Sequence, residues 1–288
     1  LNESLEVLRV DLGDHHETVA ATLYQIGLAY ARLCDYGQAM KAFNSALETQ
    51  SRLLGESHPA TLRTKREIGN LYAVYEAELD TAFDYFWSVL EAQRKIHGNK
   101  HPNIAETLHS LGFGFAQKGD TSNALRMLQE CYYMRLEFLG VDHPLQASTL
   151  HEIAKIHLRR NRVKKAIQIC NVVLSIRQES LSSGHLDVAH TLTTKGQCLC
   201  LLGDTTAALQ CLEEMALPIA TRAVGLDHPS TADIHVQIGA VHLRMCHFDQ
   251  ARKHIRLAQE MYSRASIDDD HPGMREASEQ LIRVQRDE

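Results

Sequence analysis

The chain has 288 residues, of which 44% are hydrophobic and 23% charged, and its formal net charge is −6. A net negative chain does not suit proteins that bind nucleic acid through bulk positive charge, so we predict no nucleic-acid partner. No apolar run approaches the roughly 18 residues of a membrane-spanning helix, so we predict no direct membrane insertion.

The first residues and the cysteines bear on the cellular compartment. Residues 1–10 are amphipathic and acidic, whereas a signal peptide begins with basic residues and continues with an apolar stretch. The seven cysteines are an odd number, in a chain too long to depend on a disulfide framework. We therefore predict a reducing, cytoplasmic location.

The 17 histidines raise the question of metal or acid–base chemistry, but seven of them mark a period. Spacings of 42 or 43 residues separate these marker histidines, which are His16, His58, His101, His143, His185, His228 and His271. Glycine lies three residues before most of them, and proline directly follows five. Glycine can close the end of a helix and proline fits the first turn of the next one, so each marker indicates a helix–loop–helix junction. A fixed period of this size indicates a repeat array.

The markers divide the chain, from its start, into a partial repeat, six full repeats and a closing segment. Residues 1–16 are expected to hold the second helix of an incomplete repeat, and residues 272–288 a closing helix. The six predicted repeats are residues 17–58, 59–101, 102–143, 144–185, 186–228 and 229–271. We interpret residues 1–288 as a single solenoid and, because it starts within a repeat, as part of a longer chain.

Each repeat contains two helical patterns separated by a short turn. A small residue recurs in the first pattern, at Gly27, Gly69, Gly112, Ala154, Gly196 and Gly239. The second pattern has an alanine followed four residues later by a larger residue, at Phe43, Phe86, Leu128, Cys170, Leu212 and Ile255. We predict that the two helices approach closely at the small residue and that the larger one fills the adjoining space. In repeat five, the same alignment places Met215 on the packed face and predicts a kink at Pro218.

These positions resemble a known repeat family. Repeat one contains the pattern L-x2-[LI]-G-x2-Y … A-x3-F-x2-A, as Leu23, Ile26, Gly27, Tyr30, Ala39, Phe43 and Ala46. The pattern is similar to the tetratricopeptide repeat, and the 42-residue period with L-G-x-x-H-P junctions resembles the kinesin-light-chain type. The resemblance implies an all-α fold, a right-handed superhelical α-solenoid of about 14 antiparallel stacked helices.

Motifs for catalysis or cofactor binding are absent from the sequence. It contains no G-x4-G-K-[ST], H-E-x-x-H or G-x-S-x-G motif, so we predict no enzyme, no catalytic residue and no cofactor. His242 and His247 flank a predicted turn, and His254 lies on the following helix. We considered a metal site there and predict none, because the histidines outside the markers are scattered over different repeats.

The resemblance also implies a concave groove lined by the first helix of each pair. The groove positions lie at −6, −3, +1, +4 and +5 from the small residue. Among them we predict a peptide-binding set of Arg32, Arg63, Arg66, Asn70, His109, Gln117, His151, Lys155, Arg159 and Arg244. The same offsets select neighbours that include Leu158, Gln197, Cys200, Leu201, Ala240 and Leu243.

The charges at the groove positions favour an acidic ligand. Six of these positions are basic, and only Glu106 and Asp233 are acidic. Arginine side chains can hold carboxylates in two-pronged hydrogen bonds, so we predict a non-catalytic scaffold that binds acidic, extended segments of partner proteins. The alternative is that long basic side chains merely solvate an open groove.

The single tryptophan suggests a second surface. Phe83 and Trp87 lie four residues apart on the second helix of repeat two, and the positions aligned with Trp87 in other repeats are polar. We predict a convex partner surface at this pair. It favours an alternative function, a structural or regulatory array within a larger assembly, although packing against an adjacent segment would explain it equally well.

Overall fold

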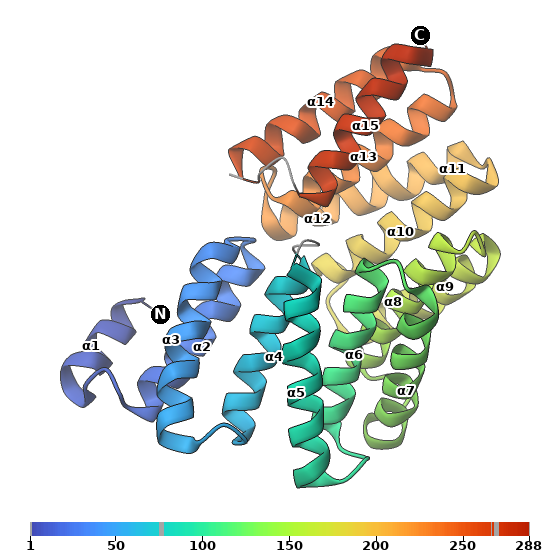
Figure 1. Cartoon of the computed structure of the whole chain (residues 1–288). Helices are drawn as coiled ribbons and strands as arrows, with labels where there is room; N and C mark the ends of the chain where they lie inside the picture. Colours follow the sequence, from blue (N-terminus) through green and yellow to red (C-terminus); the bar gives the residue numbers. More distant parts are fainter. Residues whose placement is uncertain (1, 75–77, 266, 268–270, 288) are drawn as a thin grey trace. The chain divides into compact units, whose positions relative to one another are not determined.

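The chain folds into helices. The computed structural model describes residues 2–74, 78–265, 267 and 271–287, and every regular element in this part is a helix (Figure 1). The predicted all-α class is therefore confirmed. Parts of the predicted repeats 59–101 and 229–271, together with both terminal residues, lie outside the described residues. None of the described helices combines the length and the apolarity that crossing a bilayer requires.

The chain divides into two compact units, Leu1–Phe138 and Leu139–Glu288. The single continuous superhelix stays a prediction. The helices of the first unit are α1 (Asn2–Leu12), α2 (Glu17–Arg32), α3 (Tyr36–Leu54), α4 (Pro59–Val74), α5 (Leu79–His97), α6 (Pro102–Gln117) and α7 (Thr121–Leu139), whose last residue opens the second unit. From α1 to α6 each helix packs on the next, and α4 also contacts α6, so first helices of adjacent pairs lie side by side.

The second unit follows the same scheme with one irregular helix. Its elements are α8 (Pro144–Arg159), α9 (Val163–Ser180), α10 (Leu186–Leu202), α11 (Thr205–Leu209), η2 (Gln210–Ala216), α12 (Leu217–Val224), α13 (Pro229–Arg244), α14 (Phe248–Arg264) and α15 (Pro272–Asp287). The first-type helices α8, α10 and α13 contact one another in order, and the closing helix α15 packs on both α13 and α14.

All seven marker histidines cap the helix that follows them. In each, the imidazole Nδ1 accepts a hydrogen bond from the backbone N–H two residues later, at 3.1 to 3.2 Å. The bond satisfies one of the N–H groups that a helix leaves unpaired at its start. Junction glycines such as Gly55 and Gly225 take positive φ angles of 89° and 93°. The interpretation of these histidines as junction structure is confirmed.

The closest packing within each helix pair lies at the small residue. A Cβ added at Gly112 would lie 2.5 Å from Cγ of Leu128, and one at Gly27 would lie 2.6 Å from the ring of Phe43. The same close approach recurs for Gly69 with Phe86, Gly196 with Leu212 and Gly239 with Ile255. The larger partners are fully buried or nearly so. The predicted contact between small and large residues is thus present in both units.

The second helix of repeat five contains one residue more than its counterparts. The recurring alanine of the second helix and the glycine at the following junction serve as reference points. In repeat five these are Ala208 and Gly225, which are one residue further apart than Ala124 and Gly140 in repeat three. The π-helical segment η2 absorbs this residue, because its turns are wider than those of an α-helix. The packed face shifts accordingly: Ala216 is fully buried and Met215 is 45% exposed. The prediction that Met215 lies on the packed face is therefore wrong. A helix distortion was predicted at Pro218, and the π-helical segment ends two residues before this proline.

Buried polar contacts join repeat one to repeat two and repeat two to repeat three, and the sequence pattern did not predict them. The hydroxyl of Thr64 donates to Gln50 Oε1 at 2.7 Å, and the hydroxyl of Thr107 donates to Gln93 Oε1 at 2.8 Å. In each case the second helix of one repeat contacts the first helix of the following repeat. A buried hydroxyl needs such a partner, so these bonds help to fix the stacking of neighbouring pairs.

We predict opposite effects for two glycine-to-alanine substitutions in the first unit. Gly112→Ala should destabilise by about 1–3 kcal/mol, because the new methyl group overlaps Leu128. Gly37→Ala is the matched control, since its Cβ would meet only Asp35 Oδ1 at 3.9 Å, and it should stabilise α3 by about 0.5–1 kcal/mol. Urea unfolding followed by circular dichroism measures both, and equal shifts in the midpoint would contradict the packing argument.

Candidate functional site

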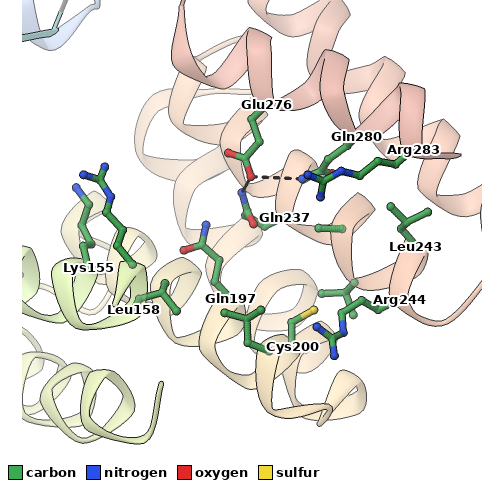
Figure 2. A pocket seen from close by; sticks show the side chains of 14 residues that line it. Lys155, Leu158, Gln197, Cys200, Gln237, Leu243, Arg244, Glu276, Gln280 and Arg283 are labelled. Atoms are coloured by element: carbon green, nitrogen blue, oxygen red, sulfur yellow. Dashed lines mark hydrogen bonds between the residues drawn. The ribbon is translucent and has the colours of Figure 1, made fainter. Parts of the chain in front are cut away.

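A cavity of about 550 Å³ opens on the first-type helices of the second unit (Figure 2). We call it the α13 pocket, because α13 contributes more side chains than any other helix. It is lined by Lys155, Leu158 and Arg159 of α8, Gln197, Cys200 and Leu201 of α10, Gln237, Ala240, Val241, Leu243 and Arg244 of α13, and Glu276, Gln280 and Arg283 of α15. On each helix these residues include pairs that are three or four positions apart, so each helix presents one face to the pocket.

The α13 pocket is basic although the chain as a whole is acidic. Four lining residues are basic (Lys155, Arg159, Arg244 and Arg283), and only Glu276 is acidic. Lys155 Nζ lies 3.1 Å from a carboxylate oxygen of its neighbour Glu152. Arg244 and Arg283 are exposed, and neither forms an ion pair with any carboxylate in the described part of the chain. The pocket therefore offers two guanidinium groups beside an apolar wall.

Two glutamine amides orient the acidic side chain of the pocket. Gln237 Nε2 donates to Glu276 Oε1 at 2.9 Å, and Gln280 Nε2 donates to the same oxygen at 3.3 Å (Figure 2). Removal from water raises the pKa of the Glu276 carboxyl above its ordinary value, and the nearby Asp233 and Glu279 carboxylates raise it further. The pocket thus contains a fixed hydrogen-bonding group that can accept from a ligand N–H.

The sequence predicted part of this pocket and missed the rest. The predicted residues Lys155, Arg159 and Arg244 lie together in it, with the apolar neighbours that the same offsets select. Glu276 and Arg283 were missed, because the offsets were applied only to the six full repeats. The sequence did contain a signal for them. In each full repeat the small residue lies eleven positions after the marker histidine, and the same count from His271 reaches Ile282. The −6 and +1 positions from Ile282 are Glu276 and Arg283.

In the first unit, Arg66 and Asn70 are engaged within the protein itself. Arg66 is buried; it donates to Glu67 Oε1 at 2.8 Å and is also paired with the carboxylate of Glu106. Asn70 Nδ2 donates to Glu67 Oε2 at 2.9 Å. Burial alone would lower the pKa of Arg66, but the two carboxylates outweigh it and raise the pKa. The positive charge that the sequence analysis assigned to this part of the groove is therefore largely balanced.

The other predicted groove residues of the first unit have different surroundings from those of the α13 pocket. Arg63 borders a cavity of about 250 Å³, and its guanidinium carbon lies 4.6 Å from the centre of the Tyr24 ring. Arg32 is exposed in the last turn of α2. His109 and Gln117 are half-buried on α6. These four predictions remain untested as ligand contacts.

His151 is a buried structural residue. Its Nε2 lies 3.0 Å from the hydroxyl of Thr194, so this contact joins α8 to α10. Burial lowers the pKa of the His151 imidazole to about 3, and the ring is therefore neutral at physiological pH. The expectation that this side chain faces a ligand is corrected: it is only 8% exposed and is not among the residues that line the α13 pocket.

The expected exposed pair Phe83–Trp87 is also corrected. Phe83 is only 8% exposed, and its ring centre lies 4.6 Å from that of Phe115. Trp87 is 43% exposed. The residues beside it on the same helix line a surface depression of about 400 Å³ with it; they are Leu90, Glu91, Arg94 and Lys95. The candidate convex surface thus contains Trp87 without Phe83.

Comparison with protein families gives one match that extends over most of the chain. The model of the tetratricopeptide repeat matches residues 1–52, 20–86, 73–137, 115–179 and 145–215. A comparison with curated proteins finds no match.

Solved structures of similar fold include several repeat proteins. The kinesin light chain nearly identical TPR-like repeats of Podosopora anserina share 18% identity, with a TM-score of 0.55 over 73% of this chain and 99% of that one. BtubC (BKLC) from P. vanneervenii shares 16% identity, with a TM-score of 0.62 over 79% of this chain and 91% of that one. A Rap protein complexed with Competence and Sporulation Factor shares 9% identity, with a TM-score of 0.64 over 99% of this chain and 80% of that one. The predicted tetratricopeptide repeat fold is confirmed, and the solved structures of kinesin-light-chain type share that fold.

We predict that His151 makes the second unit sensitive to acid. Its pKa is about 3 in the folded protein and 6.5 as an ordinary value, so only the unfolded chain gains a proton as the pH falls below 6.5. Its stabilising contribution is complete above pH 6.5 and should fall by about 2 kcal/mol at pH 5. Urea unfolding at pH 7.5 and pH 5 should therefore show a smaller pH dependence for His151→Gln than for the unaltered chain. His247→Gln, at an exposed position, controls for loss of a histidine, and an identical effect of both variants would refute the assignment.

Proposed function

We infer a protein-binding function from one premise: this chain belongs to the tetratricopeptide repeat family. Arrays of such repeats stack into extended surfaces that bind other proteins, so the chain is a protein-interaction scaffold. The Rap protein of similar fold is complexed with Competence and Sporulation Factor, which supports the same use of this chain.

The proposed ligand is an acidic, extended segment of a partner protein, bound without catalysis in the α13 pocket. The observation that carries this proposal is the pair Arg244 and Arg283, two exposed arginines without ion-pair partners among the described residues. A guanidinium group holds a carboxylate through two parallel hydrogen bonds, which gives both affinity and orientation. Acidic side chains at intervals along an extended peptide would meet these arginines from one side.

The remaining walls of the pocket suit a peptide backbone and apolar side chains. Leu158, Ala240 and Leu243 offer apolar surface, and the Glu276 carboxyl accepts hydrogen bonds. The cavity of about 550 Å³ lies within the range of roughly 300–1,000 Å³ that is typical of ligand sites. An acidic segment that also carries an apolar anchor therefore fits this pocket better than a purely polar one.

A second candidate function uses the surface around Trp87. This is the array as a structural or regulatory part of a larger assembly, and the 43% exposure of a tryptophan beside a depression supports it. Tryptophan is strongly represented among residues that dominate protein interfaces. Variants of the α13 pocket and variants at Trp87 distinguish the two functions.

For the α13 pocket, we predict that reversing the charges of two lining arginines removes most of the affinity for an acidic peptide. Arg244→Glu with Arg283→Glu should weaken binding of a fluorescent peptide of acidic residues with one leucine by at least about tenfold, equal to roughly 1.4 kcal/mol. Fluorescence anisotropy measures the affinity, and circular dichroism checks the fold. The matched control is Lys164→Glu with Arg222→Glu, which makes the same change in net charge at exposed positions outside the pocket. Equal weakening by both pairs would show that only net charge matters, and no weakening would exclude the pocket.

For the second surface, we predict that Trp87→Ala releases a copurifying protein while the pocket variant retains it. Because the side chain is partly exposed, the substitution should leave stability within about 1 kcal/mol. Pull-down with quantitative mass spectrometry measures the loss, and Tyr133→Ala removes another exposed aromatic of the first unit as a control. Identical partner lists for Trp87→Ala and the unaltered chain would reject this surface.

A further inference from the structure

Four histidines and one glutamate gather on one side of the second unit; they are His235, His242, His247, His254 and Glu213. The imidazole rings of His235 and His254 have centres 5.2 Å apart, and those of His242 and His254 lie 5.7 Å apart. Glu213 extends from η2 toward the same place, with Oε1 3.7 Å from His242 Nε2. From the sequence, we predicted no metal site at His242, His247 and His254. The structure brings Glu213 to this cluster from the preceding helix pair, which the sequence did not indicate.

Three of these side chains can present one ligand atom each to a common point. The ligand atoms of Glu213, His242 and His254 lie within 4.8 Å of one another. Around a tetrahedral Zn²⁺ with bonds of about 2.0–2.1 Å, neighbouring ligand atoms are separated by about 3.3–3.5 Å. The Glu213–His242 separation already approaches this value, and small side-chain rotations would bring His254 into line.

The hydrogen bond between His235 and His254 uses Nδ1 of His254 and leaves its Nε2 available for a metal ion. The two Nδ1 atoms are 3.0 Å apart, so one ring donates and the other accepts. If His254 donates, its Nε2 retains a lone pair for a metal ion. Histidine ligands in metal sites are usually held in this way, with the other ring nitrogen donating to a neighbouring group. His235 thus orients a ligand without being one.

The π-helical segment η2 positions Glu213 beside the histidine cluster. Glu213 lies within the π-helical segment η2, which contains the additional residue of repeat five. Segments of this kind are often found at functional sites, because they change the direction in which a side chain points. The position aligned with it in repeat two is Trp87, which is 43% exposed, and Glu213 itself is 41% exposed at its side chain. A cation can therefore reach the cluster from solvent.

We propose that Glu213, His242 and His254 form a binding site for a divalent cation of the Zn²⁺ class. Two imidazole nitrogens and one carboxylate oxygen are a donor set typical of zinc, and a water molecule or a partner group would complete the coordination. Hard cations such as Mg²⁺ and Ca²⁺ prefer oxygen ligands alone, so the site should exclude them.

The site joins three elements and is separate from the α13 pocket. The cation would link η2, α13 and α14, and so fasten repeat five to repeat six. His235 and His242 are seven residues apart and share one face of α13. The pocket residues Gln237 and Arg244 are displaced from them by two positions, which is roughly 200° around the helix and therefore the opposite face. Failure of the peptide experiment would leave the metal proposal standing, and the reverse also holds.

Titration of the full, tag-free chain with ZnCl₂ tests the proposal after dialysis against a chelator. Isothermal titration calorimetry should give one Zn²⁺ per chain, and CoCl₂ should produce the visible absorption of a low-coordinate site. Saturating Zn²⁺, at about a hundredfold excess over Kd, should raise Tm by about 5 °C. MgCl₂ and CaCl₂ at the same concentration should do neither.

Single substitutions identify the ligands. Glu213→Gln, His242→Gln and His254→Gln should each weaken Zn²⁺ binding by at least tenfold and remove the rise in Tm. His247→Gln is the matched control, since it removes a nearby histidine that is not in the ligand set, and it should leave affinity unchanged. If the His254 variant does not fold, Glu213→Gln still decides the matter, because its side chain is largely at the surface.

Two results would overturn the proposal. One is the absence of saturable Zn²⁺ binding, which would leave Glu213 and His242 as a simple polar contact. The other is binding that persists unchanged in both Glu213→Gln and His242→Gln, which would place the ion elsewhere, for example at the exposed thiol of Cys246.

Discussion

The contact on which the rest of the structure depends is the close approach of two helices at a residue without a large side chain. At Gly112, an added methyl group would lie 2.5 Å from Leu128, so the backbone of one helix rests directly on a side chain of the other. This contact fixes how the two helices of a pair cross, and its recurrence every 42 or 43 residues makes the pairs nearly equivalent. Stacking follows, because each pair has apolar surface that only its neighbours can cover.

The same arrangement leaves one face of each first-type helix free for function. Small residues are buried against the second helix, and the opposite positions line a surface whose character is set by the side chains there. In the second unit these side chains make a basic pocket in which Arg244 and Arg283 form no ion pair with any described carboxylate, whereas in the first unit Arg66 is balanced by Glu67 and Glu106. Equivalent backbone positions thus give different electrostatics, because charge depends on which residues of neighbouring repeats come within reach.

Histidine serves three purposes in this fold, and local surroundings decide which. At junctions, such as His143, the ring caps a helix by accepting at Nδ1. His151 is buried, neutral and hydrogen-bonded to the next first-type helix. His242 and His254 lie beside Glu213 in the proposed cation site. A single residue type therefore contributes to helix initiation, to stacking and to ligand chemistry, according to the solvent and partners around its two nitrogens.

The sequence by itself determined the all-α class, the repeat period and the small-to-large contact. These depend on neighbours within one helix pair, so spacing and residue size are enough to reveal them. It also identified the pocket residues Lys155, Arg159 and Arg244. Only the tertiary structure decided which side chains were available: Phe83 is buried on Phe115, and Glu213 reaches His242 from the preceding pair. Such contacts join residues about 30 positions apart, and helix-pair packing alone does not specify them, because burial and charge pairing depend on distances between helices rather than on the pattern within one.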